Sequence, residues 1–210
     1  MPTRVFLADD HVLIRQGLIE ILVRDGHRVV GEASDGHTAV QKITELQPDV
    51  ALLDVGMPLM NGIEVAQTLR QSAPRVRSII LTQHDEDQYV TAALRAGARG
   101  YVLKTQAPND LAQAIQHVMR GKVYLSPGVS QAVVDALLGK ADLPAEPLSP
   151  RERQVLQLIS EGKSTKEVAV LLGISVKTAE SHRSRLMQKL DIHETASLVR
   201  YAIRKGLIQP

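Results

Sequence analysis

The chain contains no cysteine and no tryptophan, and its 210 residues include only one phenylalanine and four tyrosines. Without cysteine, the protein has no disulfide bond, no thiolate nucleophile and no thiolate zinc site, which fits a reducing compartment. With so few aromatic rings, stacking on nucleic-acid bases is excluded as the main means of binding. The hydrophobic core must therefore be built from aliphatic side chains.

Long apolar segments are also missing. No run approaches the roughly 20 residues that a membrane-spanning helix requires, and the N-terminal sequence MPTRVFLADD lacks the basic start and apolar stretch of a secretion signal. We therefore expect a soluble, cytoplasmic protein with no membrane partner. With 44% hydrophobic residues, a chain of this length can bury real cores and has room for two domains.

Charge is unevenly distributed, although the formal net charge is only +2. Residues 1–148 carry 14 Lys+Arg and 17 Asp+Glu, whereas residues 149–210 carry 11 Lys+Arg and 6 Asp+Glu. An acidic first part and a basic second part favour a polyanion as the partner of the second part alone. An ordinary solvated surface would give the same counts, so charge by itself leaves both interpretations open.

The first part of the chain, residues 1–125, alternates short apolar runs with longer stretches whose apolar residues recur at helical intervals. Strands that alternate with helices in this way form a parallel sheet covered on both faces. The pattern predicts an α/β fold, a doubly wound five-stranded parallel sheet. The predicted strands are residues 4–8, 28–33, 50–54, 77–82 and 100–104.

The stretch GKADLPAEPLSP, residues 139–150, has one glycine, three prolines and few apolar residues, and indicates a boundary between domains. We predict a first domain over residues 1–125 and a helical linker over residues 126–147, with one helix at 126–138. An all-α domain is predicted over residues 148–210.

Four short helices are expected in this last domain because signals for helix starts recur along it. Ser149 and Ser164 each begin a capping box with a glutamate three residues later, and Ser175 can cap a third helix. The fourth helix is predicted from about residue 194 to residue 205. This is the pattern of a small helical bundle.

Polar side chains close four of the five predicted strands of the first domain. Asp9 and Asp10 follow the first strand, Asp54 ends the third, Thr82 ends the fourth and Lys104 ends the fifth. Ligands of doubly wound sheets bind beyond the carboxyl ends of the strands, so these groups should converge. Three crowded carboxylates need a cation, and hard oxygen ligands favour Mg²⁺ (or Mn²⁺). Asp10 and Asp54 would bind it directly, Asp9 through water, and a backbone carbonyl of the following loop would add a ligand.

These groups are suited to the transfer of a phosphoryl group. Lys104 and Thr82 can hold its oxygens, Mg²⁺ can neutralise its charge, and Asp54 would be the nucleophile that forms an acyl phosphate. Taken singly, an Asp after a strand is most often a turn residue or helix cap, and a Lys at a strand end is usually solvated. Five residues of the required types at four strand ends are much less probable by chance.

The motifs LADDH, LLDVGMPLMNG, ILT and GYVLK resemble those of the receiver domain of two-component response regulators, a flavodoxin-like fold. The resemblance covers residues 1 to about 125. It implies that Asp54 is the phospho-acceptor, that a sensor histidine kinase supplies the phosphoryl group, and that the carbonyl of Gly56 is the third protein ligand of the metal. It also implies that Thr82 and Tyr101 form the switch pair that responds to phosphorylation.

Two positions depart from the usual receiver pattern. Thr105 follows the lysine where many receivers carry a proline. The peptide bond before that proline is often cis in the family, and the sequence leaves open whether the bond between Lys104 and Thr105 is cis or trans. Gly56 puts no side chain over the site. We hypothesise that Gly56 and His84 set how fast water reaches the acyl phosphate.

The second domain contains a helix-turn-helix pattern. The first helix, STKEVAVLLGI, and the second, SVKTAESHRSRLMQKL, are joined by a turn at Gly173. An exposed polar helix N-terminus with flanking cations suits the major groove of DNA, although a solvated basic helix in a bundle would look similar. The residues predicted to point inward are Val168, Ala169, Leu172 and Ile174 in the first helix, and Val176, Ala179, Leu186 and Leu190 in the second.

The outward side chains of the second helix are the candidate DNA contacts. Four cations and one hydroxyl could meet phosphates, and three side chains near the first two turns could reach base edges. The first set is Lys177, Arg183, Arg185, Lys189 and Thr178; the second is Glu180, Ser181 and Ser184.

Residues 146–210 resemble the LuxR-type four-helix DNA-binding domain, through LSPRERQVLQLISEG, EVAVLLGISVKTAESHRSRLMQKL and SLVRYAIRKGLI. Joined to a receiver, this gives a response regulator of the NarL/FixJ type. The resemblance implies a transcription factor that is not an enzyme, becomes a homodimer on phosphorylation, binds double-stranded DNA, and has RNA polymerase as a possible partner.

Two alternatives remain at this point. An aspartyl-phosphate phosphohydrolase would use the same Asp, Thr, Lys and Mg²⁺, but it would carry a second Asp two residues after Asp54, where Gly56 stands, and a substrate-selecting cap. A DNA-binding protein that ignores phosphorylation would not require Asp54, Thr82 and Lys104 together.

Overall fold

The structure is a computed structural model that describes residues 2–83, 87–127, 129, 148–205 and 207–208. By the contacts between its residues, the chain divides into two compact units, residues 1–143 and residues 144–210. Among the described residues, no helix is long and apolar enough to cross a membrane.

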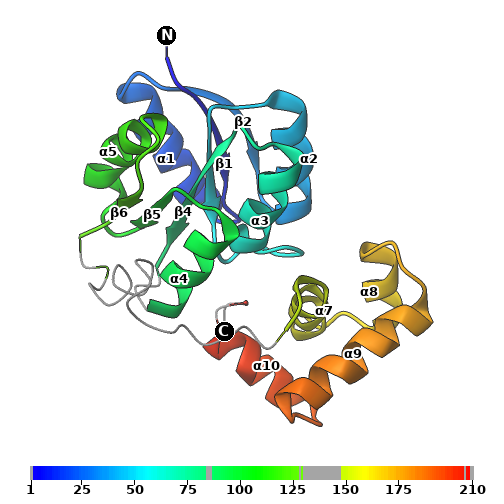
Figure 1. The fold of residues 1–210 in the computed structure, drawn as a ribbon. Helices are drawn as coiled ribbons and strands as arrows, with labels where there is room; N and C mark the ends of the chain where they lie inside the picture. Colours follow the sequence, from blue (N-terminus) through cyan, green and yellow to red (C-terminus); the bar gives the residue numbers. More distant parts are fainter. Residues whose placement is uncertain (1, 84–86, 128, 130–147, 206, 209–210) are drawn as a thin grey trace. The chain divides into compact units, whose positions relative to one another are not determined.

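The first unit is built on a six-stranded sheet whose paired strands are all parallel (Figure 1). The strand order is β2-β1-β3-β4-β5-β6, which confirms the predicted doubly wound sheet. The sixth strand was not predicted, because two residues are too short to stand out as an apolar run. The strands are β1 (Arg4–Ala8), β2 (Arg28–Ala33), β3 (Val50–Asp54), β4 (Arg77–Thr82), β5 (Gly100–Leu103) and β6 (Tyr124–Leu125).

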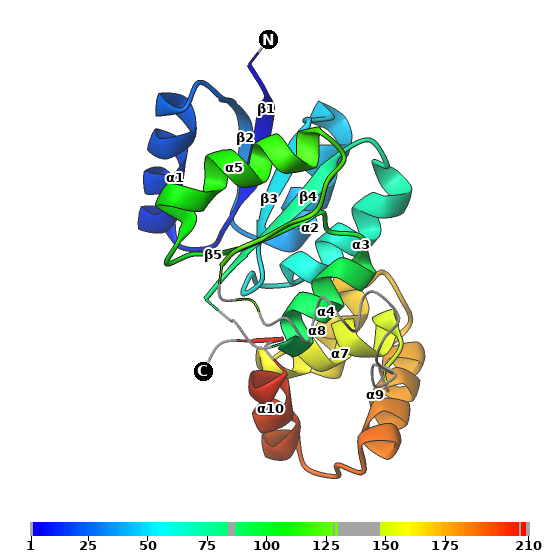
Figure 2. The same cartoon turned by 60° about the vertical axis from the view of Figure 1, so that its left-hand side comes forward.

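Among the described residues, five helices cover the two faces of this sheet. Figure 1 shows α1 (Val12–Arg24) and α5 (Ala107–Met119) on one side, and α2 (Gly36–Leu46) and α3 (Gly62–Ser72) on the other. The helix α4 (Asp87–Ala96) packs beside α3 and β5. Figure 2 shows α5 crossing in front of the strands.

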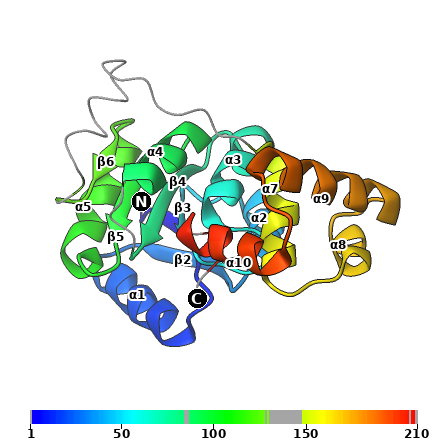
Figure 3. The ribbon, with the colours of Figure 1, turned by 90° about the horizontal axis from the view of Figure 1, so that it is seen from below.

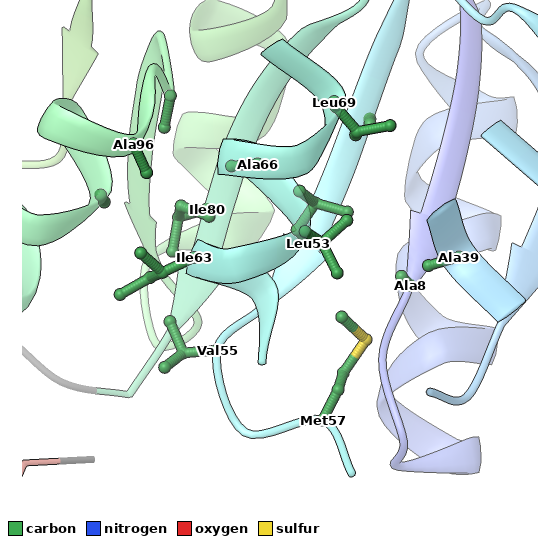
Figure 4. Close-up of a cluster of buried hydrophobic side chains, with 14 of the residues drawn as sticks. Ala8, Ala39, Leu53, Val55, Met57, Ile63, Ala66, Leu69, Ile80 and Ala96 are labelled. Atoms are coloured by element: carbon green, nitrogen blue, oxygen red, sulfur yellow. The ribbon is translucent and has the colours of Figure 1, made fainter. Parts of the chain in front are cut away.

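Each face of the sheet has its own aliphatic core. One core joins the strands to α2, α3 and α4, and Figure 4 shows Leu53 and Ile80 of the strands close to Ile63 and Ala66 of α3. The other core joins the opposite face to α1 and α5. Because all five residues of β3 are buried, the strand that carries Asp54 is held from both sides.

The described part of the second unit is a bundle of four helices, as predicted (Figure 3). Ser149 and Ser164 both form complete capping boxes with the glutamate three residues later. Ser175 caps the third helix by accepting a hydrogen bond from the backbone N–H of Thr178. The helices are α7 (Pro150–Ser160), α8 (Thr165–Leu171), α9 (Val176–Leu190) and α10 (Thr195–Arg204).

The predicted inward residues are buried or partly buried in this bundle, with one exception. Ala179 and Leu186 of α9 are fully buried, whereas Val176 is 40% exposed. Val176 is the first residue of α9, so no turn of helix precedes it to carry its side chain into the bundle. The predicted linker helix lies outside the described residues except at 126, 127 and 129.

Candidate functional site

The carboxyl ends of β1, β3, β4 and β5 lie next to one another in the sheet, and the five polar groups predicted to converge are attached there. Asp54 and Thr82 are the last residues of β3 and β4, and Lys104 directly follows β5. The backbone N–H of Lys104 donates to the carbonyl of Thr82 at 2.7 Å. The convergence inferred from strand ends is therefore present in the structure.

Lys104 bridges two carboxylates in the middle of this edge. Its Nζ lies 2.8 Å from Asp9 Oδ2 and 2.9 Å from Asp54 Oδ1. The side chains of Asp9 and Asp54 are 0% and 3% exposed, and that of Lys104 is 8% exposed. An ammonium group between two buried carboxylates offsets a repulsion that would otherwise destabilise the strand ends.

Burial and charge act on the protonation of the two central groups. Burial raises the pKa of Asp54, and the neighbouring Asp9 raises it further, while Lys104 pulls it down without cancelling the rise. Burial alone would lower the pKa of Lys104, but the carboxylates of Asp54 and Asp9 raise it. Lys104 therefore stays protonated. Additional positive charge near Asp54 would favour the ionised form of its carboxyl group.

The donor set fits a hard divalent cation. One ligand atom each from Asp9, Asp10, His11 and Asp54 can be chosen so that all lie within 4.8 Å of one another. Asp54 Oδ2 is buried and has no hydrogen-bond partner among the described residues, so it is available to a metal. Receiver domains bind Mg²⁺ at an acidic cluster of this kind.

Two residues that hold this cluster were missed from the sequence. The backbone N–H of His11 donates to Asp9 Oδ1 at 2.8 Å, and its Nδ1 lies 2.7 Å from Asp10 Oδ1. Arg15 Nη1 donates to the backbone carbonyl of Asp9 at 2.6 Å, and its Nε pairs with Glu32 at 2.7 Å. Arg15 could have been found from the sequence, because it is a basic residue one turn into the helix that follows the acidic pair.

Two glycines allow the chain to close around Asp54. The backbone N–H of Gly56 lies close enough to the Asp54 carboxylate to lower its pKa. A Cβ on Gly62 would lie 2.2 Å from the carbonyl oxygen of Asp54, so any side chain there would displace the end of β3. Asn61 caps α3 by accepting from Glu64 N–H at 3.0 Å, which fixes Gly62 at the start of the helix.

The predicted switch residues lie on neighbouring strands. Tyr101 is 0% exposed and belongs to the core on the α4 face, and Thr82 is 1% exposed. The ring of Tyr101 is thus packed inward in this structure. The described residues contain no cis peptide bond, so the bond between Lys104 and Thr105 is trans. His84, assigned a role in acyl-phosphate lifetime, lies outside the described residues.

The candidate DNA contacts on α9 fall into two groups. Two of its cations are engaged within the bundle: Lys189 Nζ lies 2.7 Å from Glu152 Oε2, and Arg183 donates to the hydroxyl of Thr195 at 3.1 Å. Within the part of the chain that the structure describes, the other two cations make no ion pair or hydrogen bond through their side chains. The exposed candidates outside these contacts are Lys177, Thr178, Glu180, Ser181, Ser184 and Arg185. Lys189 is exposed as well, although its Nζ is paired.

Comparison with known proteins gives both units a family. Residues 5–116 match the response regulator receiver domain, and residues 146–202 match the bacterial regulatory proteins of the luxR family. The chain is 39% identical over 207 residues to the transcriptional regulatory protein MctR of Rhizobium johnstonii, covering 98% of this chain and 95% of MctR. This chain belongs to the response regulators with a LuxR-type DNA-binding domain.

Other relatives of this response regulator match it over nearly the whole chain. It is 36% identical over 214 residues to the oxygen regulatory protein NreC of Staphylococcus carnosus, covering 98% of this chain and 99% of NreC. RcsB of Salmonella enterica serovar Typhimurium, solved bound to a promoter with a beryllofluoride phosphomimetic, matches with a TM-score of 0.66 and 28% identity. That match covers 96% of this chain and 98% of RcsB. The family consists of transcription regulators that bind DNA rather than conventional enzymes.

Proposed function

We propose that this response regulator is switched by phosphorylation of Asp54, with a sensor histidine kinase as the phosphoryl donor. The observation that supports it most directly is the bridge from Lys104 to Asp9 and Asp54, beside a buried and unpartnered oxygen of Asp54. A solvated turn would need neither a buried lysine nor a buried carboxylate pair.

The chemistry follows from the positions of the side chains. An oxygen of Asp54 bonds to phosphorus as the P–N bond of the kinase phosphohistidine breaks, which leaves an acyl phosphate on Asp54. Lys104 leaves its bridging position to pair with the new phosphoryl oxygens, and the hydroxyl of Thr82 donates to one of them. Asp9, Asp10, Asp54 and the backbone carbonyl of Gly56 would hold Mg²⁺ (or Mn²⁺), which when bound would offset the negative charge that gathers there.

The response starts at the neighbouring strand ends. When the hydroxyl of Thr82 moves toward the phosphoryl group, the inward ring of Tyr101 is held behind it. This favours one arrangement of the surface formed by α4 and β5, and a switch of this kind shifts a population between two existing states. Phosphorylated receivers then form a homodimer.

The second unit carries the output. We propose that α9 lies in the major groove of double-stranded DNA, with Lys177 and Arg185 on phosphates and the polar side chains of its first turns at base edges. RcsB has been solved as two dimers bound to two parallel DNAs, and that chain is 30% identical to this one. Two half-sites bound together raise the affinity because the second contact is effectively intramolecular.

We also propose the domain bounds, the location and one further partner. The receiver spans residues 1–125, the linker 126–147 and the DNA-binding domain 148–210. The protein acts in the cytoplasm, and RNA polymerase is a possible partner of the DNA-bound dimer.

The phosphorylation step can be tested on the purified chain. Acetyl phosphate with MgCl₂ should add one phosphoryl group to the wild type, detected by intact-protein mass spectrometry, and none to Asp54→Ala. A wild type that stays unmodified, or an Asp54→Ala variant that is modified equally, would remove Asp54 from this role. Repeated turnover of small phosphate esters would instead favour the phosphohydrolase.

A further inference from the structure

The segment that leaves α5 adds a short strand to the free edge of β5. Strand β6 pairs with β5 in parallel, with Tyr124 opposite Gly100 and Leu125 opposite Tyr101. The backbone N–H of Ser126 donates to the carbonyl of Tyr101 at 2.9 Å. The chain that goes on toward the second unit is therefore bonded directly to the backbone of the proposed switch residue.

The side chain of Ser126 extends this attachment. It is a polar residue only 2% exposed, and its hydroxyl donates to Asp110 Oδ2 at 2.6 Å. Ser126 Oγ also accepts a hydrogen bond from the backbone N–H of Leu103 at 3.2 Å. One hydroxyl thus joins the start of the linker, the first turn of α5, and the end of β5 next to Lys104.

Neighbouring side chains support the same attachment. The hydroxyl of Tyr124 lies near the Asp110 carboxylate, and the ring of Tyr124 lies 5.5 Å from that of His117. Burial and the nearby Asp110 carboxylate raise the pKa of Tyr124 to about 12. Leu125 and Val129 pack against the core cluster that contains Tyr101. Tyr124, Leu125, Ser126 and Val129 are therefore packed onto the receiver beside its switch.

We propose that Ser126 and Asp110 are positioning residues that fasten the start of the linker to β5, so that the state of Tyr101 reaches the DNA-binding unit through the backbone of residues 124–126. The inference rests on the proposed phosphorylation switch. A hydroxyl-to-carboxylate hydrogen bond this short and this buried resists breaking, because either partner would be left unsatisfied. Movement of β5 at Tyr101 must then move the first residues of the linker.

A structural bond and a coupling bond predict different results. If the bond between Ser126 and Asp110 only adds stability, its loss lowers the melting temperature and leaves the DNA response to phosphorylation unchanged. If it couples the two units, its loss reduces the ratio of DNA affinities measured with and without beryllofluoride, which is the coupling itself.

The experiment uses the full chain, MgCl₂ and a DNA selected from random sequence by the beryllofluoride-treated wild type. Beryllofluoride binding is followed by fluorine NMR, and DNA affinity by fluorescence anisotropy below the melting temperature. Ser126→Ala should bind beryllofluoride like the wild type, while its affinity ratio falls about fivefold or more. The matched control is Ser72→Ala, which removes an exposed hydroxyl bonded to Thr68 within α3 and should leave the ratio unchanged.

A second pair of variants approaches the same bond from α5. Asp110→Ala removes the acceptor and should reduce the ratio as Ser126→Ala does, whereas Asp110→Asn keeps an acceptor oxygen and should retain most of it. An unchanged ratio in Ser126→Ala and Asp110→Ala, with beryllofluoride bound, overturns the inference. Absence of beryllofluoride binding, or a ratio of one, in the wild type would instead contradict the proposed function.

Discussion

Lys189 Nζ lies 2.7 Å from Glu152 Oε2, so a cation near the end of the proposed recognition helix is bonded to the first turn of α7. The Glu152 side chain is 5% exposed, and the same oxygen accepts from the backbone N–H and the hydroxyl of Ser149, each at 2.8 Å. The pair thus fixes α9 against the helix that begins the DNA-binding unit. This gives Lys189 a different task from Lys177 and Arg185, whose side chains make no ion pair or hydrogen bond among the described residues.

The salt dependence of DNA binding should separate the two kinds of cation. Each phosphate contact contributes about one unit to the slope of log affinity against log salt concentration. Arg185→Gln should lower that slope by about one unit, because Arg185 is exposed and has no partner among the described residues. Lys189→Gln should weaken binding with little change in slope. Equal loss of slope in both variants, measured by anisotropy titrations over a range of salt, would assign Lys189 to a phosphate.

The ion pair of Glu152 should appear in the pH dependence of stability. Burial would raise the pKa of Glu152, but hydrogen bonds from Lys189 and Ser149 lower it from 4.5 to about 2. A pKa lowered by folding stabilises the folded state above the ordinary value, and this contribution is lost as the pH falls toward the folded pKa. The difference in the free energy of unfolding between the wild type and Glu152→Gln should therefore be constant above about pH 5 and shrink below it.

Urea unfolding followed by circular dichroism at several pH values checks this expectation. Glu167→Gln is the matched control, because Glu167 has the same place in the capping box of α8 and its pKa is also lowered, by Ser164. Glu167 is exposed, so its effect should be smaller. A difference between wild type and Glu152→Gln that does not vary with pH would contradict the lowered pKa.

The close approach of Gly62 to Asp54 predicts a large effect of a single methyl group. A Cβ on Gly62 would lie 2.2 Å from the Asp54 carbonyl oxygen, so Gly62→Ala must displace β3 or α3. We expect a loss of about 2 kcal/mol in the free energy of unfolding, together with loss of beryllofluoride binding. The control Gly17→Ala, with nothing within 4 Å of its added Cβ, should stabilise α1 by about 0.5–1 kcal/mol. If Gly62→Ala binds beryllofluoride as well as the wild type does, the predicted displacement at Asp54 is wrong.

Removal of Lys104 should make the site depend on a metal. Lys104→Met leaves the carboxylates of Asp9 and Asp54 without their buried partner, so the free energy of unfolding at neutral pH should fall by about 3 kcal/mol. MgCl₂ should restore more of this loss than it adds to the wild type, because no ammonium then competes for the same oxygens. Urea unfolding with and without MgCl₂ measures both. When Asp10→Asn is combined with Lys104→Met, MgCl₂ should no longer restore stability. If MgCl₂ still restores it, the metal binds elsewhere.

Much of the fold could be predicted from the sequence because local signals and packing agree. The apolar runs gave β1 to β4 with the bounds that the structure has, since strands buried on both faces read as continuous apolar segments. The capping boxes at Ser149 and Ser164 located two helix starts, since each cap depends on residues only three positions apart.

What the sequence could not predict depends on contacts between distant residues. Strand β6 forms through pairing with β5, and Ser126 meets Asp110 across 16 positions, so neither leaves a local pattern. Lys189 looked like its neighbouring cations because its partner Glu152 is 37 residues away. The candidate magnesium site could be predicted from the sequence because parallel strands bring their carboxyl ends to one edge of the sheet, whatever their distance in the chain.

The central claim is that a phosphoryl group on Asp54 changes how the second unit binds DNA. The most direct measurement is the affinity of the full chain for its selected DNA with MgCl₂, in the presence and absence of beryllofluoride, for wild type and Asp54→Ala. We predict that beryllofluoride raises the affinity of the wild type about tenfold or more and leaves that of Asp54→Ala unchanged. Equal affinities of the wild type under both conditions would contradict the account.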